Sequence, residues 1–383
     1  MTASPDRLSR LLEDMRSGTP RMLAALETLV GVESPSADLA ATSLCADAVA
    51  AMGAELLGAS PERVVASGRV HLRWRFGAST RVLLVGHFDT VWPVGTLARW
   101  PFSVQEGRAT GPGVFDMKAG VVQSLYAAAA LEERAGLTLL LTSDEELGSK
   151  TSRHLVESSA MGAAAALITE PAAAGGAVKT GRKGVSMYDV TVHGVAAHAS
   201  DPARGANASL EAARLMLQVE TFGDRAAGTT VTPTLLQGGV TQNTIPDRAW
   251  FYTDCRVATA AEEQRVLAAM RGLGAADPRL RVEVSGGPNR PPFPASFGEP
   301  LYERLARLAA GMGLVAPGAA FVPGGSDGNF TAAMGVPTLD GLGAVGDLAH
   351  GEGEYVVVDA IPERAAMLAA MLEELLLTLP AGS

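Results

Sequence analysis

Short apolar runs alternate with polar segments through the first half of the chain, and three of these runs predict buried β-strands. The runs, each with the motif that follows it, are residues 82–85 before GHFDT, residues 137–141 before TSDEELGS and residues 163–168 before TEP. Each motif carries a potential metal ligand: His87 in the first, Glu145 with Glu146 in the second, and Glu170 in the third. Open α/β sheets bind ligands beyond the carboxyl ends of their strands, so these side chains are expected to converge there.

The pattern of elements changes near residue 178. Before it, strand runs alternate with Ala- and Leu-rich helical stretches such as residues 117–134, which predicts a mostly parallel sheet covered by helices. From Gly184, one strand, a helix, two strands, a helix and a strand predict a ferredoxin-like split βαβ module. PNRPPFP at 288–294 marks its end. The expected organisation is an α/β catalytic domain in two parts with an inserted α+β lid domain, bounded as 1–181, 182–290 and 291–383.

The composition is that of an ordinary globular protein, with 47% hydrophobic and 19% charged residues in 383. The net charge of -10 is spread without a basic stripe, which argues against nucleic acid or an anionic membrane as a partner. The first residues, MTASPDRLSRLLEDMR, contain no apolar leader segment, so a cytoplasmic location is expected. Near the C-terminus, LAAMLEELLLTLP is broken by two glutamates and is interpreted as a core helix.

The residue types at the strand ends favour a site for two metal ions. Imidazole nitrogen and carboxylate oxygen suit zinc, cobalt or manganese, whereas an all-oxygen set would suggest magnesium or calcium. Two ions about 3.5–4 Å apart need a shared ligand, and Asp116 is suited to that role. Asp89 is expected to accept the second ring N–H of His87 and so fix its tautomer. Neighbours on extended chain face opposite ways, so one of Glu145 and Glu146 is expected to bind metal and the other to act as a base.

Six sequence blocks together resemble the signature motifs of the M20 metallopeptidases, most closely the glutamate carboxypeptidase branch. In chain order they are GHFDTVWPVGT, GPGVFDMKAG, SDEELGS, ITEP, GVAAHAS and AHGEGEY. The resemblance implies two zinc ions bridged by a water in the catalytic domain, and a lid domain that forms a homodimer. It assigns Asp116 as the bridging carboxylate and Glu145 as the general base. It assigns the remaining ligands in two pairs: His87 with Glu170, and Glu146 with His350.

The same resemblance assigns roles to residues of the lid domain. His198 in GVAAHAS is similar to a histidine that reaches the other subunit's site and stabilises the oxyanion. Asn243 in TQNTIP and Arg256 in TDCR resemble groups that hold the substrate carboxylate and the oxyanion region, and arginine suits a carboxylate because its planar fork donates two parallel hydrogen bonds. Gly324 and Gly325 in GGSDG are expected to offer backbone N–H groups as a nest for that carboxylate.

These assignments predict a dizinc hydrolase that releases an amino acid with a free carboxylate from a small peptide or an N-acyl amino acid. A glutamate carboxypeptidase-like exopeptidase is the first expectation, although the sequence shows no dedicated second cation for a γ-carboxylate. The same scaffold also resembles those of aminoacylases, deacetylases, desuccinylases and dipeptidases, so these activities are the alternatives. Two other classes are also alternatives: a serine hydrolase that uses Ser326 of GGSDG, which fits the G-x-S-x-G pattern, and a binding protein that has lost its metals. The serine reading leaves the acidic cluster unexplained, and the binding-protein reading requires a missing ligand where none is missing.

Overall fold

The computed structural model describes residues 4–379, which divide into two compact units. Unit 1 comprises the residues up to Gly181, Pro294–Val322 and the residues from Ser326 onward, and unit 2 comprises Arg182–Phe293 with Pro323–Gly325. Unit 2 ends at Phe293 rather than at residue 290, because the backbones of Arg182 and Phe293 exchange two hydrogen bonds of 2.8 and 2.9 Å. The segment Pro323–Gly325 belongs to unit 2 although the sequence pattern assigned it to the catalytic domain.

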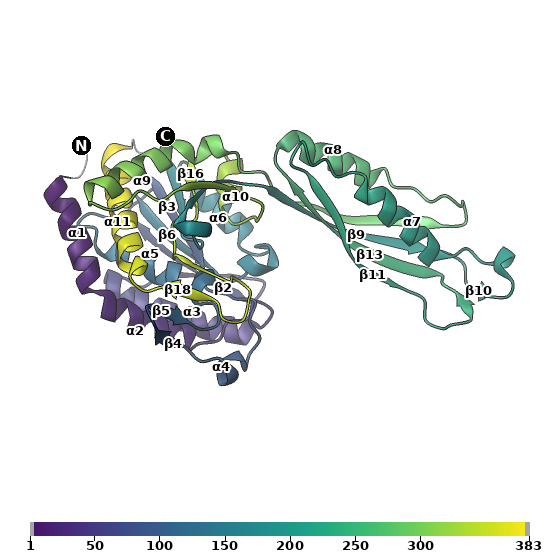
Figure 1. The fold of residues 1–383 in the computed structure, drawn as a ribbon, viewed down its shortest axis with the longest axis horizontal. Helices are drawn as coiled ribbons and strands as arrows, with labels where there is room; N and C mark the ends of the chain where they lie inside the picture. The colour runs from purple at the N-terminus through teal and green to yellow at the C-terminus, as the bar shows by residue number, and fades with distance from the viewer. Residues whose placement is uncertain (1–3, 380–383) are drawn as a thin grey trace. The chain divides into compact units, whose positions relative to one another are not determined.

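Unit 1 is built on a six-stranded mixed sheet (Figure 1). In spatial order its strands are β1 (Glu62–Ala66), β2 (Arg69–Phe76), β6 (Leu137–Thr142), β3 (Val82–His87), β7 (Ala165–Ile168) and β16 (Thr338–Leu339). The four strands from β6 to β16 are parallel, and β1 and β2 extend the sheet antiparallel. Every residue of β6, β3 and β7 is buried, as expected for strands covered on both faces.

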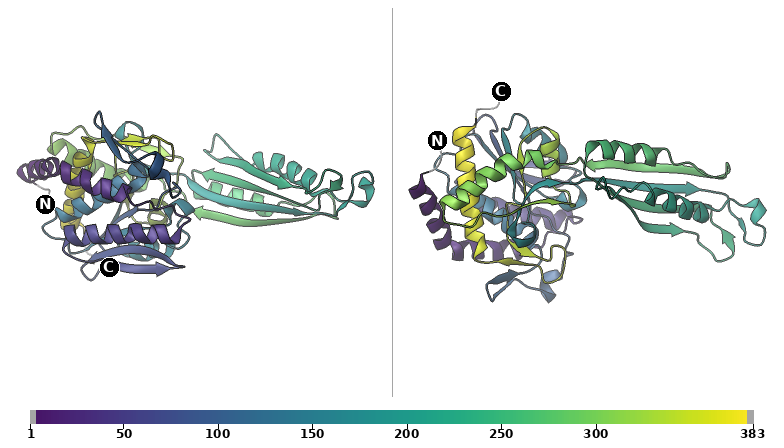
Figure 2. Two further views of the ribbon diagram at one scale, coloured as in Figure 1. Left: turned by 90° about the horizontal axis from the view of Figure 1, so that it is seen from below. Right: turned by 45° about the horizontal axis from the view of Figure 1, so that its top comes forward.

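Helices cover both faces of this sheet (Figure 2). Successive residues of β3 pack into different layers. Val82 and Leu84 face one layer, whereas Leu83 and Val85 face the other. The first layer contains α1 (Pro5–Ser17), α2 (Thr19–Val30), α3 (Leu39–Leu57), α5 (Ala119–Ala129), α9 (Glu299–Gly311) and α11 (Ala360–Thr378). The second layer contains α6 (Arg153–Ala160) and α10 (Gly328–Ala333).

The apolar helices α3 and α11 differ in how they compare with a membrane span. Among residues 4–379, α3 alone meets the length and hydropathy of a membrane span. It buries Cys45, Ala46 and Val49 in the core, as the covering helix of a sheet does. The terminal helix α11 buries most of its residues in the same core, which agrees with its interpretation as a core helix.

Smaller elements complete unit 1. A four-stranded antiparallel sheet contains β17 (Gly346–Asp347), β18 (Tyr355–Val357), β5 (Arg108–Thr110) and β4 (Ser103–Gln105), in that spatial order. A two-stranded sheet pairs β15 (Ala319–Val322) with β8 (Val178–Arg182). The short helical turns are α4 (Thr96–Arg99), η1 (Val114–Lys118), η2 (Glu145–Leu147), η3 (Ala174–Gly176) and η5 (Ala295–Phe297).

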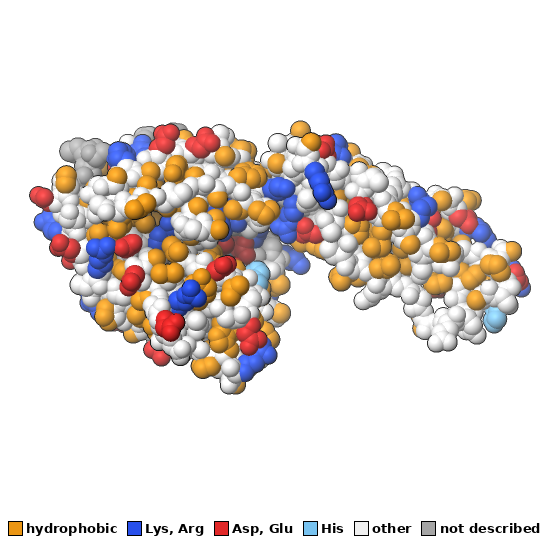
Figure 3. All heavy atoms as spheres, in the orientation of Figure 1, with side chains coloured by type: hydrophobic (Ala, Val, Ile, Leu, Met, Phe, Trp, Pro, Cys, Tyr) orange, Lys and Arg blue, Asp and Glu red, His pale blue; other side chains and the backbone are white. Residues whose placement is uncertain are grey.

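Unit 2 is a four-stranded antiparallel sheet with two helices, in the chain order β-α-β-β-α-β. Its main elements are β9 (Gly184–His193), α7 (Ala208–Glu220), β11 (Thr230–Gly238), β13 (Arg248–Val257), α8 (Ala260–Arg271) and β14 (Arg281–Arg290). The spatial order β11-β13-β9-β14 is that of a ferredoxin-like fold, as the sequence predicts. Asn207 and Thr259 cap the two helices through side-chain oxygens that accept backbone N–H groups. Minor elements are β10 (Ala197–His198), β12 (Thr244–Ile245) and η4 (Pro202–Arg204). Hydrophobic side chains are exposed along this unit among interspersed charges (Figure 3).

Candidate active site

The strand ends of unit 1 bring acidic and histidine side chains together. His87 is the last residue of β3, Glu145 opens η2 shortly after β6, and Glu170 follows β7. Asp116 lies within η1 just before α5, and His350 lies in the loop between β17 and β18. Segments far apart in the sequence therefore deliver their functional groups to one edge of the sheet, as the topology of an open α/β sheet predicts.

Asp116 lies between the two histidines and directs one carboxylate oxygen to each. Its Oδ1 is 3.3 Å from Nε2 of His87, and its Oδ2 is 3.4 Å from Nε2 of His350. His87 Nε2 is also 3.5 Å from Oε1 of Glu170, and His350 Nε2 is 3.0 Å from Oε1 of Glu146. The five residues thus form two clusters that share Asp116.

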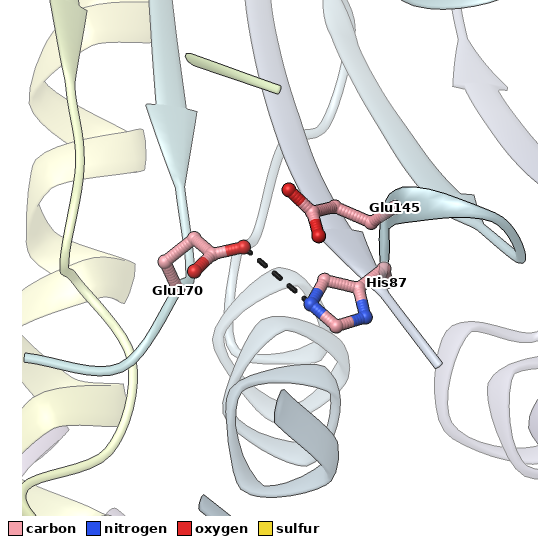
Figure 4. Close-up of side chains that lie close together, drawn as sticks. All are labelled: His87, Glu145 and Glu170. Atoms are coloured by element: carbon pink, nitrogen blue, oxygen red, sulfur yellow. Dashed lines mark ion pairs between the residues drawn. The ribbon is translucent and has the colours of Figure 1, made fainter. Parts of the chain in front are cut away.

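Glu145 belongs to the His87 side of this arrangement. Ligand atoms of His87, Glu145 and Glu170 all lie within 4.8 Å of one another. Figure 4 shows the three side chains directed toward a common space, with the His87–Glu170 contact marked. Glu146, the next residue, belongs instead to a group with His87 and Asp116 and contacts His350.

The carboxylates of the site favour positive charge on the two histidines. Burial opposes protonation of His87, but the nearby carboxylates of Asp116, Asp89 and Glu170 outweigh it and raise the pKa of His87 well above its ordinary value. Asp116 and Glu146 raise the pKa of His350 to about 10, against the smaller effect of burial. Burial tends to raise the pKa of Asp116, but both histidines reverse this and hold it below its usual range.

The residues present fit a pair of bound cations. Within the described chain, His87 Nε2 and Asp116 Oδ1 are buried atoms that make no hydrogen bond of good geometry. Buried polar atoms normally have a partner, so two such atoms 3.3 Å apart indicate a place for a bound ion. Mixed imidazole and carboxylate donors are the ligand set that zinc and its neighbours prefer.

Comparison with known proteins agrees with this geometry. Residues 83–374 match the model of "Peptidase family M20/M25/M40". Carboxypeptidase G2 from Pseudomonas sp. (strain RS-16) is 32% identical over 387 residues, which cover 93% of this chain and 89% of that protein. This chain belongs to the M20 peptidase family. It is an M20 metallopeptidase.

Solved structures of other M20 proteins share its fold. The M20 family metallo-carboxypeptidase Sso-CP2 from Sulfolobus solfataricus superimposes with a TM-score of 0.70 at 16% identity, covering 92% of this chain and 98% of that one. Bacillus subtilis YXEP, described as a dinuclear metal binding peptidase, gives a TM-score of 0.62 at 14% identity, covering 95% and 100%. At such identities these structures show the common fold.

The surroundings of the M20 site refine one expectation and correct another. The carboxylate of Asp89 faces Nδ1 of His87 at 3.5 Å, as expected, but the backbone oxygen of Asp89 is the nearer acceptor at 3.0 Å. That carboxylate accepts the Ser36 hydroxyl and the backbone N–H groups of Glu145 and Glu146, so it holds the η2 turn. Glu145 and Glu146 also lie on a 3₁₀ turn rather than on extended chain, so the alternation argument does not separate them. They diverge because successive residues of a 3₁₀ turn are rotated about its axis.

The candidate substrate residues of unit 2 do not form one group within a chain. His198 and Asn243 are neighbours, because the Ala199 N–H donates to the Asn243 oxygen at 2.8 Å and His198 pairs with Thr244. Arg256 lies near the far end of β13 and donates two hydrogen bonds, of 2.8 and 2.9 Å, to Asp254. Arg248 and Arg256 are eight residues apart on β13, which corresponds to about 26 Å at the usual rise per strand residue.

The backbone of Gly324 and Gly325 makes a contact that differs from the expected nest. Neither glycine has a positive φ, so the segment does not have the alternating conformation of one kind of nest. Instead, both carbonyl oxygens accept hydrogen bonds from Arg182, at 3.0 and 3.4 Å. Arg290 packs on the other side, since a Cβ on Gly325 would lie 2.7 Å from its Cδ. Two buried guanidinium groups therefore lie beside this segment, and the sequence pattern pointed to Arg182 but not to Arg290.

The alternative that used Ser326 as a nucleophile is also wrong. Its hydroxyl is fully buried and donates to Asp340 at 2.5 Å. The histidine that this reading required, His350, lies instead with Glu146 and Asp116. The family assignment as a metallopeptidase likewise overturns the reading as a binding protein without metals.

Two buried acids that support the site, Asp327 and Glu354, could not be singled out from the sequence because single acidic residues in loops carry no distinctive pattern. Asp327 accepts hydrogen bonds from the hydroxyls of Ser149 and Thr142, which flank the η2 turn. Glu354 accepts from the Phe115 N–H, next to Asp116, at 3.3 Å. Burial raises the pKa of Glu354 to about 8. Only their positions inside GGSDG and AHGEGEY offered a signal.

Proposed function

We propose that this M20 metallopeptidase binds two divalent ions, with zinc as the first expectation, and removes an amino acid that carries a free carboxylate from a small peptide or an N-acyl group. One observation carries the proposal: the two oxygens of Asp116 face two different histidines, each of which has its own glutamate. A shared carboxylate of this kind is what a two-ion site requires. His87 and Glu170 would hold one ion, and Glu146 and His350 the other.

Two ions held by these residues would supply Lewis-acid activation of the amide carbonyl and of the attacking water. The chain's own contribution is proton transfer by Glu145, whose side chain shares a space with His87 and Glu170. Its backbone N–H donates to Asp89 at 3.2 Å, so a buried carboxylate fixes the turn that carries the base. Glu145 would take the proton from water and deliver it to the leaving nitrogen.

The release of a terminal amino acid is inferred from the chemistry of unit 2 and from the likeness to carboxypeptidase G2. Arg182 and Arg290 are buried guanidinium groups beside Gly324 and Gly325, and Arg256 lies at the same end of unit 2, where it pairs with Val185. Planar forks of this kind recognise carboxylates by paired hydrogen bonds. Asn243 and His198 lie at the other end of β13 and would serve the oxyanion region of a neighbouring chain.

Homodimerisation through unit 2 is part of the proposal. β11 is an edge strand of the four-stranded sheet and exposes the neighbouring Leu235 and Leu236 at 54% and 50%. On α7, which packs beside β11, Leu210 and Leu217 are each 70% exposed and lie two helical turns apart on one face. An unpaired edge beside an apolar helix face is a surface that a second copy would cover.

The substrate class is tested with metal-loaded enzyme and matched substrate pairs. N-acyl-glutamate, N-acyl-alanine and N-acyl-leucine are compared with the same compounds amidated at the carboxylate, and kcat/KM is measured for each. Carboxylate recognition predicts that amidation lowers kcat/KM for every amino acid, and full-rate cleavage of the amides would refute it. A glutamate preference predicts the highest value for N-acyl-glutamate, and equal values across the three acids would instead favour an aminoacylase or a dipeptidase of broad range.

A further inference from the structure

Arg364 on α11 is a buried cation whose partners are all backbone carbonyls. Its side chain donates from Nε to Gly343 O at 3.0 Å, from Nη1 to Gly176 O at 3.2 Å, and from Nη2 to Gly341 O. The residue is 4% exposed, and within residues 4–379 no carboxylate lies within ion-pair distance of it. Burial accordingly lowers the pKa of Arg364 to about 10.

A buried charge without a counter-charge is unfavourable, so mere space filling does not explain this residue. An apolar side chain of similar length would fill the same volume without the cost of desolvating a charge. The property that only arginine supplies is a rigid planar fork that donates in several directions at once. Arg364 therefore fixes three carbonyls relative to one another.

Two of those carbonyls belong to a segment that holds Glu170. The Leu342 N–H donates to Ile168 O at 3.1 Å, and the Gly343 N–H donates to Glu170 O at 2.9 Å. The Ala172 N–H donates back to Ala344 O at 2.9 Å. The approach is close, because a Cβ on Gly343 would lie 2.2 Å from Thr169 O. Gly343 thus sits between the guanidinium on one side and the backbone of Glu170 on the other.

The other end of the same loop is anchored separately. Gly346 pairs with Val356 in the β17–β18 ladder, and the Val357 N–H donates to Val345 O at 2.8 Å. These bonds lie between Gly343 and His350 along the chain. A disturbance at Gly343 therefore reaches Glu170 directly, whereas the β17–β18 pairing shields His350 from it.

We propose that Arg364 is a positioning residue for Glu170, so that its loss weakens the ion held by His87 and Glu170 while the ion held by Glu146 and His350 is retained. This inference rests on the two-ion centre of the proposed function. Outer groups that orient a metal ligand typically change metal affinity by about 10- to 100-fold when they are removed. A change of that size is expected here, confined to one of the two ions.

The test is a zinc titration of metal-depleted protein against a competing chelator, which measures both dissociation constants. Wild type is compared with Arg364→Met, Arg364→Lys and the control Arg16→Met. Arg16 is 53% exposed and pairs with Glu363 at the start of the same helix, so its loss removes a surface arginine without touching the Gly343 segment. Circular dichroism and the melting temperature of each metal-free variant establish that it is folded.

Wild type and Arg16→Met are both expected to bind two ions, and each of the two dissociation constants should be the same in Arg16→Met as in wild type. Arg364→Met is expected to keep one affinity unchanged and to weaken the other by at least about 10-fold. Arg364→Lys keeps the charge but loses the fork, so it should show the same selective loss to a smaller degree, and it decides the matter if the methionine variant does not fold. Unchanged affinities in a folded variant, or equal weakening of both ions, would overturn the inference. Failure of wild type to bind two ions would overturn the metal centre itself.

Discussion

Replacement of Glu145 by glutamine is expected to abolish turnover and to leave metal binding intact. The carboxamide has the size of the carboxylate but cannot accept the proton of water. Loss of a general base costs about 10²- to 10⁴-fold in rate, which is about 2.7–5.4 kcal/mol of transition-state stabilisation at 1.36 kcal/mol per tenfold. The turn itself should persist, because the bond from the Glu145 backbone N–H to Asp89 does not involve the substituted side chain.

The adjacent residue provides a matched control. Glu146→Gln makes the same chemical change one position along the same turn, but Oε1 of Glu146 contacts His350 at 3.0 Å and belongs to the proposed ligand set. That variant should lose bound metal, measured as the metal-to-protein ratio, together with its activity. Both proteins are assayed for kcat on N-acyl-glutamate. Near-normal turnover in Glu145→Gln would refute its role as the base, and loss of metal from it would show that Glu145 is a ligand.

Three further outcomes follow from the structure. If His198 serves the site of a neighbouring chain, mixed His198→Ala and Glu145→Gln chains should recover activity, since a hybrid dimer has one site with both groups; no recovery after verified subunit exchange would contradict it. Arginines of α9 lower the pKa of Glu374, so its carboxylate stabilises the fold above its unfolded pKa of 4.5 and loses that effect as the pH falls below it. Glu374→Gln should therefore lower the melting temperature at pH 7 and differ less from wild type at pH 3.5, and a constant difference would contradict the ion pair. Leu84→Ala, at a fully buried position of β3, should cost about 2–5 kcal/mol in chemical denaturation, whereas Val65→Ala, at a 65% exposed position, should cost within about 0.5 kcal/mol.

Much of unit 1 could be predicted because its chemistry follows directly from buried strands. The apolar run at residues 137–141 predicts a strand, which the structure has as Leu137–Thr142, and the topology of a parallel sheet then places the residues after it at one edge. The order of elements likewise predicts the ferredoxin-like arrangement of unit 2. The two-cluster arrangement around Asp116 required more than this, and it followed from the resemblance to the M20 peptidases.

The interactions that could not be predicted depend on which atom of a residue faces its partner. The motif GGSDG places two glycines together but does not show that their carbonyls, rather than their N–H groups, face Arg182. The apolar C-terminal helix gives no sign that Arg364 reaches back to the loop beside Glu170. Such contacts are long-range in sequence and are set by loop conformation, on which hydrophobic periodicity carries no information.

The length of β13 implies that the activity of this enzyme depends on its concentration. Asn243 lies next to β12, just before β13 begins, and Arg256 lies near the other end of β13. The strand from Arg248 to Arg256 spans about 26 Å, far more than an acyl-amino acid. If one substrate contacts both residues, they must come from different polypeptides. Catalysis would then vanish on dilution below the dissociation constant of the subunits, even with every metal in place. Specific activity should fall with enzyme concentration and return when the inactive Glu145→Gln chain is added as a donor of its intact unit 2.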